Sequence, residues 1–143
     1  MSVKQISIFL ENTKGRLAEV TRLLAARGVN IRALSLADTA DFGVLRIIVN
    51  DPDACLAALK ESGMIAQVTE VLAVEMADKP GGLSRVLAAL DAAGLNVEYM
   101  YAYVEKTGDN AIVICKIDDK ERAARVLAEN GIGTLSADSL KAL

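Results

Sequence analysis

Two short segments place a polar residue and glycine just before a predicted helix, a pattern suited to binding an anion. They are residues 11–17 (ENTKGRL) and 77–83 (ADKPGGL). A helix N-terminus leaves its first amide groups without intrahelical partners and carries partial positive charge. Glycine at that place lets a carboxylate or a small phosphate approach the backbone, and Gly15, Gly81 and Gly82 would allow this.

The same segments carry polar side chains for the rest of a ligand. Asn12 or Asp78 would offer an oxygen to an ammonium group, and Arg16 is placed to meet a carboxylate. A purely structural explanation is equally open, because an Asn or Asp followed by Gly near a helix start is also ordinary turn chemistry. The local sequence alone leaves both explanations standing.

The two segments belong to two copies of one repeated unit. A shift of 66 positions aligns residues 12–30 with residues 78–96, and 7 of these 19 pairs are identical. The identical pairs are Gly15/Gly81, Leu17/Leu83, Val20/Val86, Leu24/Leu90, Ala26/Ala92, Gly28/Gly94 and Asn30/Asn96. An internal repeat of this kind predicts two structural copies of one unit. We therefore expect one domain over residues 1–68 and a second over residues 69–143.

Each copy shows the same succession of hydrophobic periods. Residues 4–10 alternate as a strand does, and Leu83, Val86, Leu87 and Leu90 form the apolar stripe of a helix. Further strands are expected over residues 29–37 and 44–50, and over 95–104 and 111–117 in the second copy. The order β-α-β-β-α-β predicts two ferredoxin-like domains in tandem, an α+β fold with antiparallel sheets and helices on one face.

Two more features bear on how the elements are placed. Residues 111–117 are apolar at both odd and even positions, so we expect both faces of that strand to be buried. Asn30 and Asn96 begin the second strand of each copy, and we expect them close to the same helix end as the glycine turns. There they would contact the main-chain groups of a ligand or terminate a turn.

Composition excludes several classes of function. The chain has 16 Lys and Arg against 19 Asp and Glu, a net charge of −3, so nucleic acid is not expected as a partner. It contains no histidine, which excludes His-based catalysis and nearly all zinc enzymes. Cys55 and Cys115 form no CxxC motif and are expected to be reduced core residues. The first residues show no signal-peptide pattern and no apolar run reaches membrane-spanning length, so a cytoplasmic location without membrane contact is expected.

On these residues, both halves resemble ACT domains, the amino-acid-sensing modules of metabolic regulation. The motif is a strand, then Asp-Lys-Pro-Gly-Gly-Leu, a helix, and Gly-Leu-Asn-Val-Glu opening the next strand. The first copy, Asn-Thr-Lys-Gly-Arg-Leu with Gly-Val-Asn-Ile-Arg, lacks the proline and the second glycine. The chain as a whole resembles small stand-alone tandem ACT proteins, and its first half also resembles the regulatory subunit of acetolactate synthase.

The resemblance implies binding of a free amino acid between ACT modules, with no catalytic residue, cofactor or metal. Carried onto this chain, the implied ligand-binding residues are Asn12, Gly15, Arg16, Leu17, Asn30, Asp78, Gly81, Gly82, Leu83 and Asn96. Because the two loops differ, their affinities are expected to differ. A homodimer is the expected assembly.

Two alternative functions remain. One is a regulatory subunit that acts through a complex with an amino-acid biosynthetic enzyme of the acetolactate synthase type. The other is a small acylphosphatase-like hydrolase that would use Arg16 and Asn30 around an anion. The doubled architecture and the differing loops disfavour the hydrolase.

Overall fold

A computed structural model describes residues 2–38 and 41–143 of the chain. The chain divides into two compact modules. The first module is Lys4–Thr69, and the second is Glu70–Leu143 together with the start of the chain up to Val3. A single 13-residue strand, β4 (Ile65–Ala77), carries the chain from the first module into the second. The two modules are therefore joined by one uninterrupted strand.

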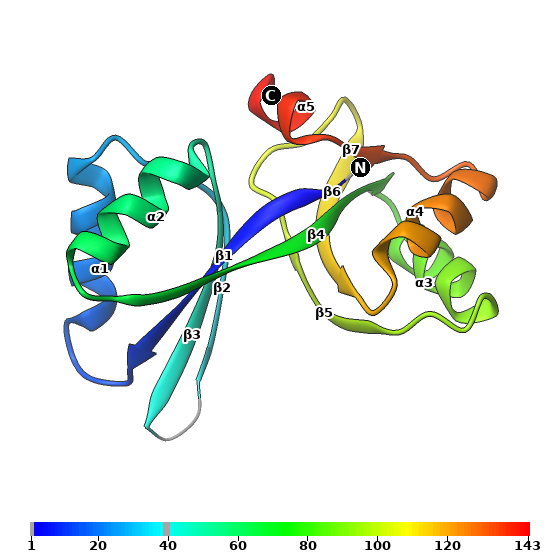
Figure 1. Ribbon diagram of the computed structural model, residues 1–143. Helices are drawn as coiled ribbons and strands as arrows, with labels where there is room; N and C mark the ends of the chain where they lie inside the picture. The colour runs from blue at the N-terminus through cyan, green and yellow to red at the C-terminus, as the bar shows by residue number, and fades with distance from the viewer. Residues whose placement is uncertain (1, 39–40) are drawn as a thin grey trace. The chain divides into compact units, whose positions relative to one another are not determined.

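The first module has the predicted order of elements. They are β1 (Val3–Glu11), α1 (Arg16–Ala26), β2 (Ile31–Asp38), β3 (Phe42–Val49), α2 (Pro52–Glu61) and the start of β4. The sheet order is β2-β3-β1-β4, with β3 antiparallel to both β1 and β2. Both helices cover one face of this sheet (Figure 1). Ile6 and Ile8 from β1 pack there in one core with Leu24 and Leu59 from the helices.

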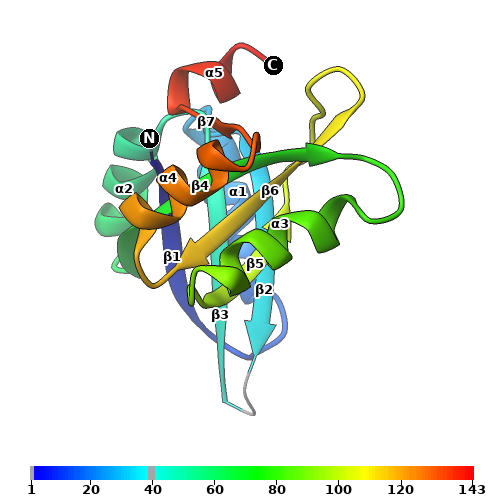
Figure 2. The same cartoon turned by 90° about the vertical axis from the view of Figure 1, so that its right-hand side faces the viewer.

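The second module repeats this arrangement. After β4 come α3 (Gly82–Ala92), β5 (Val97–Ala102), β6 (Asn110–Ile117), α4 (Lys120–Glu129), β7 (Thr134–Leu135) and α5 (Ala137–Lys141). The sheet order is β5-β6-β4-β7, with β6 antiparallel to β4 and β5. Figure 2 shows α3 and α4 side by side on one face of these strands. Two βαββαβ units with antiparallel sheets and helices on one face confirm the predicted α+β fold.

Strand β6 is buried on both faces, as its doubly apolar sequence predicts. Val113, Cys115 and Ile117 belong to the core under the helices. Ile112 and Ile114, which alternate with them on the opposite face, are also buried. Strand positions of opposite parity point to opposite faces, so neither face of this strand is open to solvent.

Both cysteines are buried and unpaired. Burial raises the pKa of the Cys115 thiol from its ordinary value of 9.0 to about 12. The pKa of Cys55 rises to about 11, chiefly through burial and further through the nearby Asp51 carboxylate. Both thiols therefore remain protonated at neutral pH and act as small core side chains. Across residues 2–38 and 41–143, every helix is too short or too polar to span a bilayer.

Candidate functional site

The helices of this protein begin in two different ways. Helices α2, α4 and α5 have conventional N-caps, in which Asp51, Asp119 and Ser136 accept a hydrogen bond from an amide of the first turn. Helices α1 and α3 instead follow Gly15 and Gly81, whose φ angles are 88° and 87°, and in the described structure neither has a side-chain cap hydrogen bond. The first amide of each helix donates to the preceding loop, Arg16 to the Thr13 carbonyl and Gly82 to the Lys79 carbonyl. The next amides of the first turn are left for water or a ligand.

A second glycine brings the start of α3 unusually close to the end of β4. A β carbon on Gly82 would overlap the carbonyl oxygen of Ala77 and lie 3.0 Å from its carbonyl carbon. Only glycine permits this approach. The corresponding residue of the first module is Arg16, so the turn before α1 cannot have the same close packing.

A pocket of about 590 Å³ lies beside the start of α3, entirely within the second module. Its walls are the end of β4, the first turns of α3 and the loop between α4 and β7. Strand β7 has only two residues and pairs with Ala73 and Val74, whereas β4 continues to Ala77. The Glu75 amide donates to the Gly133 carbonyl over 2.9 Å, and the sheet edge is open beyond this contact, at Met76 and Ala77. The lining residues are Glu75, Met76, Ala77, Lys79, Pro80, Gly81, Gly82, Arg85, Val86, Asn110, Gly131, Ile132 and Gly133.

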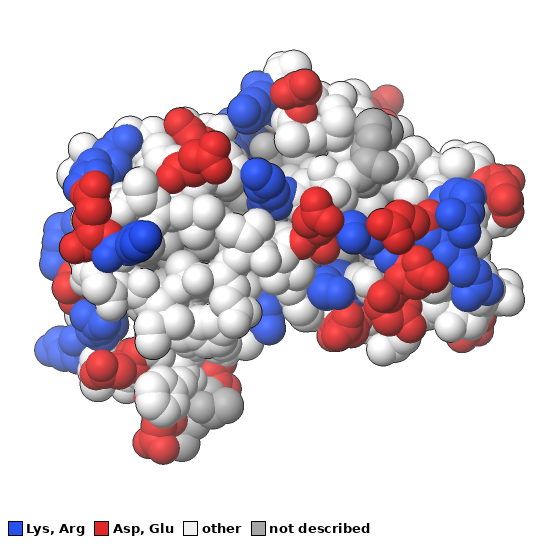
Figure 3. Space-filling view, viewed as in Figure 1, with Lys and Arg blue, Asp and Glu red and all other residues white. Residues whose placement is uncertain are grey.

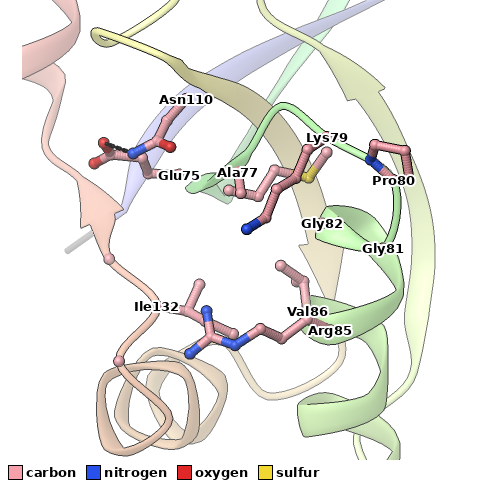
Figure 4. Close-up of a pocket in the computed structure, with 13 residues that line it drawn as sticks. Glu75, Ala77, Lys79, Pro80, Gly81, Gly82, Arg85, Val86, Asn110 and Ile132 are labelled. Atoms are coloured by element: carbon pink, nitrogen blue, oxygen red, sulfur yellow. Dashed lines mark hydrogen bonds between the residues drawn. The ribbon is translucent and has the colours of Figure 1, made fainter.

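Charged groups of both signs line this pocket (Figure 4). The Lys79 amino group points into the cavity from the loop before α3. The Arg85 guanidinium extends from α3 toward the loop that carries Ile132, and it donates a hydrogen bond to the carbonyl of Asn130. At another edge, the Asn110 amide donates to Glu75 Oε1 over 2.8 Å. The pocket thus offers two cations to an anion and a carboxylate to a cation, beside the start of α3.

The equivalent place in the first module contains its own ion pair. Arg16 Nη1 lies 3.0 Å from Glu19 Oε2, and the side chain of Arg16 is 31% exposed. Glu19 is the counterpart of Arg85 at the shift of 66 positions. The start of α1 is therefore partly occupied by protein side chains, and a carboxylate replaces the cation of the second module.

The polar residues that were expected to meet an ammonium group contact the neighbouring hairpin instead. Asp78 forms an ion pair with Lys106, which lies in the β5–β6 connection. Asn12 Nδ2 lies 3.4 Å from Asp38 Oδ2, at the β2–β3 connection. Neither Asp78 nor Leu83 lines the pocket, and the side chains of Leu17 and Leu83 are exposed.

The expectation that Asn30 and Asn96 lie near the glycine turns is wrong. Each follows the C-terminal end of the helix whose N-terminal end carries the turn, and 11 helical residues separate the two ends. That length is about 16 Å. The backbone amides of Asn30 and Asn96 donate hydrogen bonds to Asn50 Oδ1 and Asp118 Oδ1, at 2.8 Å and 3.2 Å.

Of the predicted residues in the second copy, the pocket brings together Gly81 and Gly82. It adds four polar residues that the sequence analysis did not select: Glu75, Lys79, Arg85 and Asn110. Lys79 lies within the recognised motif. Arg85 could have been found from the sequence, because the aligned residue of the first copy, Glu19, has the opposite charge. A reversal of charge next to the repeated turn indicates a functional difference between the copies.

Outside the pocket, charges of both signs are interleaved on the surface. On the face in Figure 3, Lys and Arg alternate with Asp and Glu over the second module. Such mixing produces little long-range field of one sign. This face therefore shows no patch dominated by one sign of charge.

Two ferredoxin-like modules, each with a glycine turn before its first helix, define a paired-domain architecture. The match to a known family covers residues 1–143, and the chain belongs to the ACT domain pair family. No curated protein sequence matches the chain.

Solved structures agree with this assignment. Protein BT0572 from Bacteroides thetaiotaomicron is 40% identical, with a TM-score of 0.92 over 100% of this chain and 98% of that one. The ligand-free regulatory subunit of aspartate kinase from Thermus thermophilus is 17% identical, with a TM-score of 0.62 over 89% and 91%. The corresponding subunit from Thermus flavus is 19% identical, with a TM-score of 0.62 over 90% and 92%. The two kinase subunits share the fold of this chain.

Proposed function

We propose that this protein is a regulatory sensor that binds a free amino acid in the pocket of its second module. The observation that carries the proposal is the juxtaposition of an uncapped helix start with charged groups of both signs around one cavity. The ligand carboxylate would meet the amino group of Lys79 and the amides of the first turn of α3 that follow Gly82. Its ammonium group would meet the carboxylate of Glu75. No residue is assigned a catalytic role.

The energetics of such a site are reasonable for a metabolite sensor. The helix dipole contributes about 0.3–2 kcal/mol to binding a carboxylate. Micromolar to millimolar affinity requires about 4–8 kcal/mol in total. Hydrogen bonds to charged groups contribute about 1.5–3 kcal/mol each, so Lys79 and Glu75 together supply a large part of the difference. Burial of the ligand against Val86 and Ile132 would add to this.

The first module is proposed as the weaker site. The candidate ligand-binding residues Asn12, Gly15, Arg16 and Leu17 surround a helix start that the Arg16–Glu19 ion pair already neutralises. An anion there would compete with Glu19 for Arg16. Asn30 and Asn96 remain proposed contacts only for a ligand that binds at the C-terminal end of α1 or α3, away from the glycine turns.

The protein is further proposed to form a homodimer. Strand β2 stands at the end of the strand order in the first module and carries Leu34 and Leu36, which are 55% and 49% exposed. Edge strands with apolar side chains readily pair with another chain. Light scattering after size-exclusion chromatography tests this proposal, since Leu36→Lys should shift a dimer toward the monomer. A metabolic enzyme as partner is tested by pull-down from the native extract.

Calorimetric titration with the twenty amino acids tests the proposed function. The informative variant is Gly81→Val, with Gly15→Val as its matched control. Both glycines have nearly the same positive φ and open space where a β carbon would lie, so the backbone strain should be equal. We expect Gly81→Val to weaken binding by about tenfold or more, because the side chain blocks approach to the α3 amides. Equal affinity of the two variants would remove the α3 turn from the site.

A further inference from the structure

We infer that the ligand of the second module is an amino acid with an acidic side chain, such as aspartate or glutamate. This inference rests on the proposed function and specifies the chemical class of ligand that the pocket selects. It follows from the charges around the cavity, from the way Arg85 is held, and from the difference between the two modules.

An amino acid with an uncharged side chain would not neutralise all the charged residues that line the pocket. Lys79 and Arg85 are cations, and Glu75 is the single acidic residue among those that line the cavity. A zwitterion with an uncharged side chain supplies one carboxylate and one ammonium group, which pair with one cation and with Glu75. The second cation then lacks an anion, and the amides of α3 add further positive potential. A second carboxylate on the ligand restores the balance.

Arg85 is placed to bind this second carboxylate. It lies one turn after Gly81 and Gly82, so it projects from the same face of α3, about 5 Å along the axis. The guanidinium is held by its hydrogen bond to the Asn130 carbonyl, and its Nη2 lies 3.5 Å from the position of a β carbon on Gly131. A guanidinium has five N–H donors, so most remain available for a carboxylate. Its planar geometry suits bidentate pairing.

Glu75 is oriented to bind an ammonium group. Its Oε1 accepts the amide of Asn110, and its Oε2 lies 3.7 Å from the position of a β carbon on Gly133. A carboxylate accepts about four hydrogen bonds, so one amide donor leaves capacity for an ammonium group. The pocket therefore presents separate places for the three charged groups of an acidic amino acid.

The first module provides an internal comparison. Glu19 stands where Arg85 stands, and it pairs with Arg16 at 3.0 Å. A carboxylate at this position would repel an acidic side chain. The selection for an acidic ligand is therefore a property of the second module alone.

Calorimetric titration with matched ligands tests the inference. L-Glutamate and L-aspartate are compared with L-glutamine and L-asparagine, which have nearly the same shape without the second charge. We expect the better of the two acids to bind wild-type protein at least about tenfold more tightly than its amide. Arg85→Gln should reduce this preference to about threefold or less, while Arg125→Gln, an exposed arginine on α4, should leave it unchanged. Thermal unfolding of each variant verifies that it is folded.

The outcomes separate this inference from the proposed function. If an amide or an apolar amino acid binds as tightly as the acids, the acidic ligand class is overturned while amino-acid binding stands. If Arg85→Gln keeps the full preference, Arg85 is not the selective residue and the inference is wrong. If no amino acid binds wild-type protein, the proposed function and the inference both fail. Glutarate, which has both carboxylates and no ammonium group, should bind more weakly than glutamate if Glu75 has its assigned role.

Discussion

Gly82 packs directly against the carbonyl group of Ala77, with no room for a side chain between them. This contact joins the first turn of α3 to the last residue of β4, so the helix start is fixed at the open edge of the sheet. The pocket borders both residues. The position of the proposed anion site therefore depends on one glycine that has no counterpart in the first module.

The first prediction concerns this contact. Gly82→Ala should lower the free energy of unfolding by about 1–3 kcal/mol, because the added methyl group must displace a strand end or a helix. Urea titration followed by circular dichroism measures this change. The matched control is Arg16→Ala at the equivalent position of α1, where a β carbon is already present. An equal loss in both variants, or no loss in Gly82→Ala, would contradict the close packing.

A second prediction separates helix stability from ligand binding. Asp119→Ala removes the N-cap of α4, in which the carboxylate accepts from the amide of Arg122 at 3.1 Å. The expected loss is about 1 kcal/mol of unfolding free energy. Ligand affinity measured by calorimetry should not change, since Asp119 does not line the pocket. A large fall in affinity would contradict this prediction and show that ligand binding depends on the stability of the whole module.

The fold could be predicted from the sequence because the residues that begin and end each helix lie close together in the chain and recur in both copies. Gly28, Gly63, Gly94 and Gly131 have φ angles of 71–72°, as expected for residues that end helices. Asp51 caps α2, and Pro52 follows it at the first helical position, an arrangement typical of helix starts. Each of these features depends on a few neighbouring residues, so the local amino-acid sequence is enough to predict it.

The site was less predictable because it depends on contacts between distant segments. Glu75 and Asn110 come from different strands, and only the β4–β6 pairing brings them to hydrogen-bonding distance. Arg85 acquires its role from the loop after α4, which begins 45 residues later at Asn130. Asn96 lies far from the glycine turn because α3 runs from that turn toward β5, so the two lie at opposite ends of the helix. Residue type alone contains none of this information.

A third prediction concerns pH. The folded protein keeps Cys115 protonated to about pH 12 and Cys55 to about pH 11, whereas the thiols of the unfolded chain ionise near their ordinary pKa of 9.0. Both contributions to stability are therefore complete below pH 9 and are lost as the pH rises above it. Each thiol should add up to about 1.4 kcal/mol per pH unit to this loss.

The measurement is urea unfolding of wild-type protein and of Cys115→Ala at several pH values from 8 to 10.5. The variant should lose less stability between pH 9 and pH 10.5 than the wild type does. Lysine and tyrosine ionise in both proteins, so their contribution to the pH dependence cancels in the difference between wild type and variant. Identical pH dependence would show that the Cys115 thiol is not held protonated by burial.

A fourth prediction addresses the role of Asp78. Asp78 forms an ion pair with Lys106, and the two side chains are 45% and 59% exposed, respectively. Exposed ion pairs contribute little to stability. A double-mutant cycle of Asp78→Asn and Lys106→Met should therefore give a coupling free energy of about 1 kcal/mol or less. High salt should reduce this coupling. If Asp78 binds the ligand ammonium instead, Asp78→Asn would weaken ligand binding while Lys106→Met would not.

The most direct test of the central claim is an NMR titration of the ¹⁵N-labelled protein, residues 1–143, with the twenty amino acids. We predict that at least one of them shifts the amide resonances of Gly81, Gly82, Leu83 and Ser84 in a saturable way. The corresponding amides from Gly15 to Ala18 should shift less or only at higher concentration. Saturable binding of an amino acid that leaves the α3 amides unmoved, or the absence of binding by all twenty, would contradict the claim.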